Sequence, residues 1–166
     1  VEADVTDQAG ETHHGELSLP LGNRKTALSV DVPEKVLAEK GVKMTFHLFN
    51  AAGMDIDAQL RYLIDKGKWQ KTNTNKKIDL PRLKSGRYAI EAICGEDTIK
   101  RDFMVFSLDD KRPVTETNDW FFVSDSRFPN DGTPVTVQVG SSAKDVHVAY
   151  SIIYDQTVLE SGTFER

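Results

Sequence analysis

The segment LKSGRYAIEA, residues 83–92, decides the fold of this chain. Tyr88, Ile90 and Ala92 recur at every second position, which is the period of a strand with one buried face. Gly86 permits a tight corner before this strand, and the Tyr88 hydroxyl can return to the backbone of the corner while its ring is buried. Such a tyrosine corner is typical of immunoglobulin-like sandwiches, and an ordinary turn before an aromatic strand residue is the alternative.

The same alternation recurs on both sides of this segment. Its apolar positions are Leu17, Leu19 and Leu21; Leu28, Val30 and Val32; Met44, Phe46 and Leu48; Leu60, Tyr62 and Ile64; Ile78 and Leu80; and Ile99, Phe103, Val105 and Leu108. This pattern predicts about seven strands between Leu17 and Leu108, the number and spacing of a two-sheet sandwich. Only residues 33–40 suggest a helix, of one or two turns. We expect an all-β, immunoglobulin-like sandwich over residues 15–108.

Composition divides the rest of the chain. Residues 1–14 are polar and lack a hydrophobic period, so we expect a flexible lead-in. Residues 109–119 are polar and have the character of a linker. Further strand patterns lie at residues 120–123, 135–139, 146–153 and 157–160, with a turn signal at 130–132. Because a complete sandwich normally uses more strands, we expect residues 120–166 to form a partial second β-domain or to pack against the first.

Charge and composition exclude several classes of function. The net charge of −5 argues against nucleic-acid binding, which needs clustered Lys and Arg in excess. No run approaches the roughly 20 apolar residues of a membrane span. A single cysteine, Cys94, excludes an internal disulfide framework and a multi-cysteine zinc site. The sequence has no phosphate-binding glycine loop and no nucleophile elbow, so we expect no cofactor. A targeting segment is also not recognisable after Val1.

Polar candidates for a metal site lack ligand spacing. His13, His14, His47 and His147 are either adjacent or far apart in sequence. Asp55 and Asp57 can share one face of a strand and bind a hard cation, but calcium needs more oxygen ligands than this pair supplies. A solvated turn is the better interpretation, and we expect no metal.

Large aromatic residues allow two interpretations. Trp69, Trp120, Phe121 and Phe122 are a platform for sugars or proteins if they are exposed, and core residues if they are not. Trp120 begins the first strand of the second part, where Trp120 and Phe122 face one way and Phe121 faces the other. Because large aromatic residues commonly fill cores, we prefer the second interpretation and assign Trp120 a structural role.

Several segments resemble bacterial alpha-2-macroglobulin family proteins. They are residues 28–33, the Asn50-Ala51-Ala52-Gly53 turn, residues 83–92, Phe106-Ser107-Leu108-Asp109-Asp110-Lys111-Arg112-Pro113 with Trp120-Phe121, and Val137-Gln138-Val139-Gly140-Ser141-Ser142. The resemblance covers most of residues 17–162 and implies a macroglobulin-type β-sandwich. Such proteins are large secreted or periplasmic protease traps, often lipid-anchored. The resemblance therefore implies an extracytoplasmic location, in the periplasm or at the cell surface. It also implies partners among the neighbouring domains of a parent protein and, through that parent, proteases.

The chain departs from this family at its reactive centre. The family thioester joins a cysteine to a glutamine three positions later, whereas Asp97 follows Cys94 at that distance and has no amide to release as ammonia. The sequence has no recognisable thioester motif and no helical thioester domain. We expect Cys94 to be buried and inert, although folding can bring His47 close to it.

The sequence thus predicts a structural and interaction module without catalysis of its own. Its alternative is an adhesin-like or carbohydrate-binding sandwich. An enzyme domain would require titratable groups that converge in a pocket, and the sequence offers no convincing set.

Overall fold

The computed structural model describes residues 2–6, 12–16, 25–125, 127 and 130–165, the first two segments by their backbone only. These residues form the strands β1–β14 and one turn of 3₁₀ helix, η1, so the predicted all-β fold is confirmed. The chain divides into two compact units, residues 1–109 and 110–166. This division falls inside the polar stretch 109–119, where the sequence predicted a linker.

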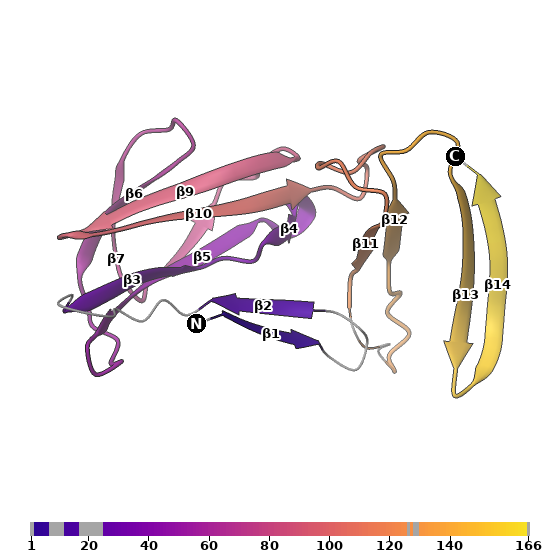
Figure 1. Cartoon of the computed structure of the whole chain (residues 1–166), viewed down its shortest axis with the longest axis horizontal. Coiled ribbons are helices and arrows are strands. Elements are labelled where there is room, and N and C mark those ends of the chain that lie inside the picture. The colour runs from indigo at the N-terminus through magenta and orange to yellow at the C-terminus, as the bar shows by residue number, and fades with distance from the viewer. Residues whose placement is uncertain (1, 7–11, 17–24, 126, 128–129, 166) are drawn as a thin grey trace. The chain divides into compact units, whose positions relative to one another are not determined.

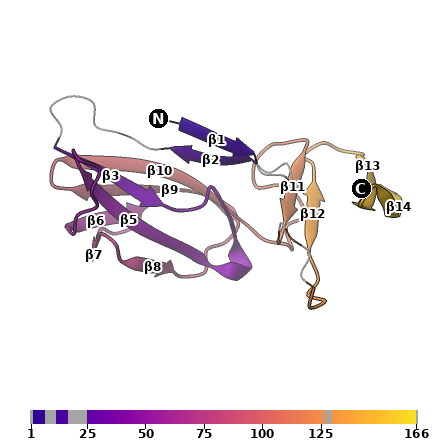
Figure 2. The ribbon, with the colours of Figure 1, turned by 90° about the horizontal axis from the view of Figure 1, so that it is seen from below.

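Two sheets build the first unit, and Figures 1 and 2 show them as facing layers. The smaller sheet has the order β3-β5-β8, formed by β3 (Thr26–Asp31), β5 (Val42–Asn50) and β8 (Lys77–Leu80). The larger has the order β4-β10-β9-β6-β7, formed by β4 (Lys35–Leu37), β10 (Asp97–Phe106), β9 (Gly86–Cys94), β6 (Gln59–Ile64) and β7 (Gln70–Asn73). All neighbours are antiparallel except β4, which runs parallel to β10. Three strands facing five is an immunoglobulin-like sandwich.

The core of this unit follows from the alternation in the sequence. On β5, Met44, Phe46 and Leu48 are buried, while the residues between them are only partly buried. The ring of Phe46 lies 5.4 Å from the ring of Tyr62 on the opposite sheet, which joins the two layers. Burying a side chain of this size contributes roughly 1.5–3 kcal/mol of hydrophobic free energy. Ile90 of β9 belongs to the same core.

Two sequence expectations differ from the structure. Residues 33–40 form β4 followed by η1 (Ala38–Lys40) instead of a longer helix, because Val36 and Leu37 are buried and pair with the end of β10. Within the lead-in expected at 1–14, the structure also has strands that the sequence did not predict, since β1 (Glu2–Thr6) and β2 (Thr12–Glu16) pair as an antiparallel hairpin. Backbone pairing needs no apolar period, so hydrophobic alternation cannot find such strands. The strand expected at Leu17–Leu21 lies outside the described residues.

The second unit consists of two hairpins. One joins β11 (Trp120–Val123) to β12 (Val137–Gly140), and the other joins β13 (His147–Tyr154) to β14 (Thr157–Glu165). Strand β14 extends well beyond the predicted 157–160, and a bulge interrupts its register at Ile152 and Ile153. Within the described part of this unit, no sheet has more than two strands.

Candidate interaction surface

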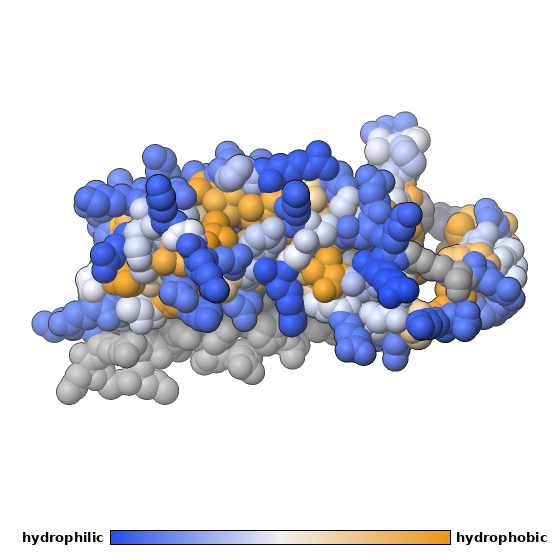
Figure 3. Space-filling view, turned by 90° about the horizontal axis from the view of Figure 1, so that it is seen from above, coloured by the Kyte–Doolittle hydropathy of each residue, from blue (hydrophilic) through white to orange (hydrophobic). Residues whose placement is uncertain are grey.

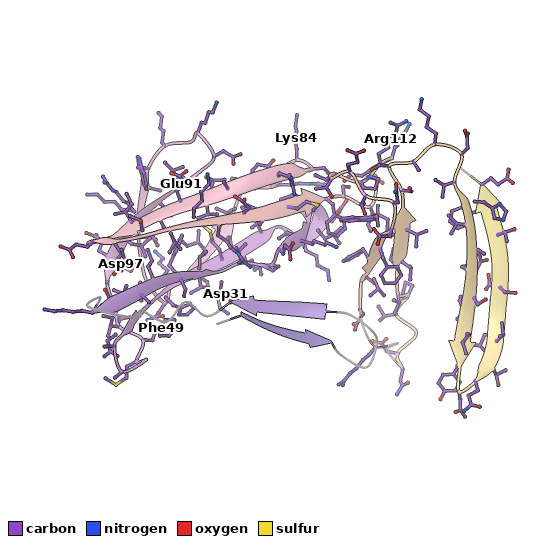
Figure 4. All side chains as sticks on the ribbon, in the orientation of Figure 1. Asp31, Phe49, Lys84, Glu91, Asp97 and Arg112 are labelled. Carbon is purple, nitrogen blue, oxygen red and sulfur yellow. The ribbon has the colours of Figure 1, made fainter. Side chains whose placement is uncertain are left out.

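The predicted tyrosine corner is present in the first unit. The Tyr88 hydroxyl donates a hydrogen bond to the backbone oxygen of Lys84 at 2.9 Å, and the Tyr88 ring stacks on Phe103 at 5.5 Å. Figure 4 shows Lys84 beside the start of β9. Gly86 is the first residue of β9, but its backbone is not left-handed and an added Cβ would meet only ordinary contacts. The corner therefore depends on Tyr88 and has no steric need for glycine at position 86.

Cys94 lies at the end of a hairpin, where its side chain is buried. It pairs with Asp97 across the two-residue turn Gly95-Glu96, where Gly95 has a φ of 58°. The thiol is buried and lies 3.6 Å from the backbone oxygen of Gln59. Burial raises the pKa of the Cys94 thiol, and the negative charge of Asp97 raises the pKa further. A raised pKa suppresses the thiolate, which is the opposite of what a cysteine nucleophile needs.

Asp97 has a structural role instead. Its carboxylate accepts a hydrogen bond from the Thr26 hydroxyl of β3, which joins the hairpin end to the other sheet. Figure 4 shows Asp97 at this end of β10. The carboxylate is buried and held in place, so it does not provide a partner for acyl chemistry at Cys94.

His47 is on the outer face of β5, away from Cys94. Its neighbours Phe46 and Leu48 point into the core that contains Cys94, so His47 points outward. There its Nδ1 lies 2.7 Å from Oδ2 of Asp55. Desolvation raises the pKa of Asp55, but hydrogen bonds from His47 and Asn75 outweigh it and hold the pKa below its usual value.

Polar contacts stabilise the loop between β5 and β6. Asp57 accepts a hydrogen bond from the Asn75 side chain at 2.9 Å, and the same Asn75 side chain also interacts with Asp55. The buried Thr74 hydroxyl accepts from the Ala58 amide and donates to the Ile56 oxygen, both at 2.9 Å. Among the described residues, no cluster of His, Cys, Asp and Glu has the composition of a metal site.

The two tryptophans differ in exposure. Trp120 is only 7% exposed, and its indole N–H donates to Oε1 of Gln138 at 3.0 Å, so Trp120 is a core residue of its hairpin. Trp69 is 43% exposed, and the Arg61 guanidinium carbon lies 5.0 Å from its ring centre. The sandwich therefore presents a cation–aromatic pair to solvent, formed by Arg61 of β6 and by Trp69, which precedes the edge strand β7.

The β13–β14 hairpin carries an apolar face. Its cross-strand pairs place Val148 opposite Phe164, Tyr150 opposite Gly162 and Ile152 opposite Glu160 on one face. Tyr150, Ile152 and Phe164 are between 40% and 44% exposed. The space-filling view shows orange, apolar residues at the surface of this hairpin, at the right of Figure 3. We call the side chains of Val148, Tyr150, Ile152 and Phe164 the hairpin face.

Two contacts shape the hairpin face around Gly162. The Tyr150 hydroxyl donates to Oε1 of Glu160 at 2.8 Å, and the tilted rings of Tyr150 and Phe164 lie 6.5 Å apart. A Cβ built on Gly162 would lie 2.8 Å from the Tyr150 ring, so the aromatic ring takes the place of a side chain at this position. Aromatic residues opposite glycine stabilise strand pairs in this way.

The β11–β12 hairpin also has an apolar outer side. Phe121 pairs with Val139, and Val123 pairs with Val137. The side chains of these two pairs lie on the face of the hairpin opposite to the buried Trp120. A pocket of about 620 Å³ that is open to solvent lies in the second unit and is lined in part by Phe121, Val139, Val148 and Phe164. The apolar sides of both hairpins thus border a space that side chains do not fill.

Comparisons with known proteins add no family. No protein-family model matches the sequence, and no curated protein matches it. In the described part of the chain, no helix has the length and apolar character needed to cross a membrane. The family resemblance stays a prediction, and the function is argued from the residues.

The hairpin face was not identified from the sequence, although its signal was present. The alternation of Val148, Tyr150 and Ile152 predicted a strand, and we assumed that each apolar alternation faces a core. The signal for an interaction surface is the composition of residues 147–165. This segment contains the apolar alternation together with Glu160 and Glu165, and it has no Lys or Arg. The Arg61–Trp69 contact had no such signal, because it depends on the path of the chain between β6 and β7.

Proposed function

We propose that the chain is a structural and interaction module of a larger extracytoplasmic protein of the alpha-2-macroglobulin-like, protease-trapping kind. In this role it has no catalysis of its own. The first unit is the rigid scaffold, and the second unit contacts neighbouring domains of the same parent protein. Any contact with a protease is made through the parent.

One observation carries this proposal. The first unit has a complete apolar core, with Phe46, Ile90 and Val105 fully enclosed, whereas the second unit leaves apolar residues of both hairpins exposed. Apolar side chains that are exposed together on one face are typical of sites that contact other protein surface. The titratable groups of the first unit support the same interpretation, because Asp97 and Asp55 are engaged in hydrogen bonds that stabilise the fold.

The coding sequence of the parent protein tests the proposal. We expect further β-sandwich units, a cleavable bait-like segment and a Cys-x-Glu-Gln stretch. We also expect the purified parent to enclose an added endoprotease, which then cleaves a small chromogenic peptide but not casein. Catalytic motifs in the parent, or a protease that still digests casein at its full rate, would refute the proposal.

A second candidate function is carbohydrate binding, and the exposed Trp69 favours it. Sugars stack on exposed aromatic rings, and the adjacent Arg61 supplies hydrogen-bond donors for hydroxyl groups. The buried Trp120 does not contribute to such a surface. Titration of a Trp120→Phe chain with chito- and malto-oligosaccharides would isolate the fluorescence of Trp69. A saturable shift that Trp69→Ala removes would support this alternative, and an unchanged spectrum would exclude these sugars.

A further inference from the structure

We propose that the free edge of β14 binds an extended segment of a partner polypeptide, in which apolar side chains alternate with polar and basic ones. The inference deepens the proposed function and rests on it, because it names the kind of partner that the interaction module takes. The mode is β-augmentation, in which a peptide adds a strand to an exposed sheet edge. Backbone hydrogen bonds provide affinity, and the side chains on the two faces provide specificity.

The first argument is the incomplete sheet. Among the described residues, β13 and β14 pair only with each other, so each strand has one unpaired edge. A two-stranded hairpin is marginally stable in water, and three or more strands with an apolar face are needed for independent stability. A third strand beside β14 would continue the hairpin face next to Phe164 and Gly162.

The second argument is the contrast with the two edges of the larger sheet in the first unit. Strand β7 is an outer strand of the larger sheet, and its sequence Gln-Lys-Thr-Asn is polar. The other outer strand, β4, has only three residues. Short and polar edges are how proteins prevent unwanted strand pairing. Strand β14 has nine residues and an apolar face, so it lacks both protections.

The third argument is charge, which selects the occupant. Residues 147–165 contain Asp155, Glu160 and Glu165 and neither Lys nor Arg. A second copy of the hairpin offers no Lys or Arg to these carboxylates, so it lacks a complementary charge. A strand with Lys or Arg opposite Glu160 and Glu165 is complementary. Both residues belong to β14, so charge also favours this strand over β13.

The register of β14 defines a probe peptide. An antiparallel strand would place basic residues beside Glu165 and Glu160 and apolar residues beside Phe164 and Gly162. Threonine suits the positions beside Thr163 and Ser161, on the polar face. The probe is therefore acetyl-Lys-Val-Thr-Ile-Thr-Lys-Val-amide. The matched controls are the same peptide with both lysines replaced by glutamate, and the same peptide with proline in place of isoleucine.

The experiment titrates the full chain with each peptide and follows backbone amide shifts by NMR. We expect the lysine peptide to bind saturably, with shifts concentrated in residues 157–165, and the glutamate and proline peptides to bind at least about tenfold more weakly. The double variant Glu160→Gln, Glu165→Gln should weaken lysine-peptide binding by about three- to tenfold. The control Glu96→Gln, on an exposed turn of the sandwich, should leave it unchanged.

Several results would overturn the inference. They are equal binding of the lysine and glutamate peptides, shifts centred outside β14, or no saturation of the lysine peptide at millimolar concentration. Dimerisation of the chain that Glu160→Gln and Glu165→Gln strengthen would identify a second copy as the occupant instead. If the peptide fails while the parent still encloses a protease, only the β14 inference falls. Catalytic motifs in the parent would remove the proposed function whatever the peptides do.

Discussion

The hydroxyl of Tyr88 donates a hydrogen bond to the backbone oxygen of Lys84, four residues earlier, at 2.9 Å. This contact closes the corner before β9, and the same ring stacks on Phe103 of β10. One side chain thus connects the turn that precedes β9 to the strand that follows it. The position of the β9–β10 pair in the larger sheet depends partly on this contact.

Removal of that hydroxyl should weaken the first unit. We expect Tyr88→Phe to lower the free energy of unfolding by about 0.5–1.5 kcal/mol, because the ring packing stays and one hydrogen bond is lost. Urea denaturation followed by circular dichroism measures the change. Tyr154→Phe is the matched control, since that side chain is 73% exposed, and it should have no measurable effect. If Tyr88→Phe and the unmutated chain are equally stable, the hydrogen bond of the corner does not stabilise the fold.

The centre of the sandwich should be far less tolerant. Phe46 is fully buried and contacts the Tyr62 ring, so Phe46→Ala should cost about 3–5 kcal/mol through lost packing and the resulting cavity. Met54 is 61% exposed, so the free energy of unfolding of Met54→Ala should lie within about 0.5 kcal/mol of that of the unmutated chain. The same denaturation experiment compares the two. A small effect of Phe46→Ala would mean that the two sheets do not enclose a common core.

Cys94 should be chemically protected while the chain is folded. Burial and the charge of Asp97 both raise the pKa of the thiol, so little thiolate is present at pH 8. We expect a chromogenic disulfide reagent to label Cys94 roughly a hundredfold more slowly than in urea. A Cys94→Ser, Ala51→Cys chain places the thiol on an exposed turn and should react at the rate of a free thiol. Fast labelling of native Cys94 would contradict its burial.

The His47–Asp55 contact predicts a pH dependence at the loop between β5 and β6. The pKa of Asp55 lies below its usual value of 3.8 in the folded chain. Its ionised form therefore stabilises the fold above that pH, and the stabilisation is lost as the pH falls through the lower folded value. Carboxyl NMR titration should give an Asp55 midpoint below 3.8, and His47→Ala should move it upward. The control His147→Ala, far from this loop in sequence, should leave the Asp55 midpoint unchanged. An Asp55 midpoint at or above 3.8 in the unmutated chain would disprove the contact.

The sandwich could be predicted from the sequence because its core obeys one simple rule. Apolar residues such as Phe46 and Ile90 occupy every second position and do fill the space between two sheets. The rule fails where another contact decides the structure. Residues 33–40 look helical, but Val36 and Leu37 gain more from pairing with β10 and from burial than a short isolated helix would gain.

The polar and exposed contacts were beyond the sequence for a different reason. The pair His47 and Asp55 forms because Phe49 and Asp55 bridge two backbone segments, and neither residue type predicts that turn. The hairpin face around Tyr150 was predicted as a strand, but alternation alone does not tell whether an apolar face meets a core or solvent. Only the strand neighbours in the folded chain distinguish these cases, and among the described residues no third strand pairs with β13 or β14.

The short strand β4 limits how the end of β10 can pair with a strand from another molecule. It pairs with Met104–Phe106, at the very end of β10, just before the chain leaves the sandwich. The hydrogen-bonding positions at this end of β10 are thereby occupied from within the unit. A strand from another molecule therefore cannot add to this end of β10, which reduces the tendency of the sandwich to exchange strands while it folds.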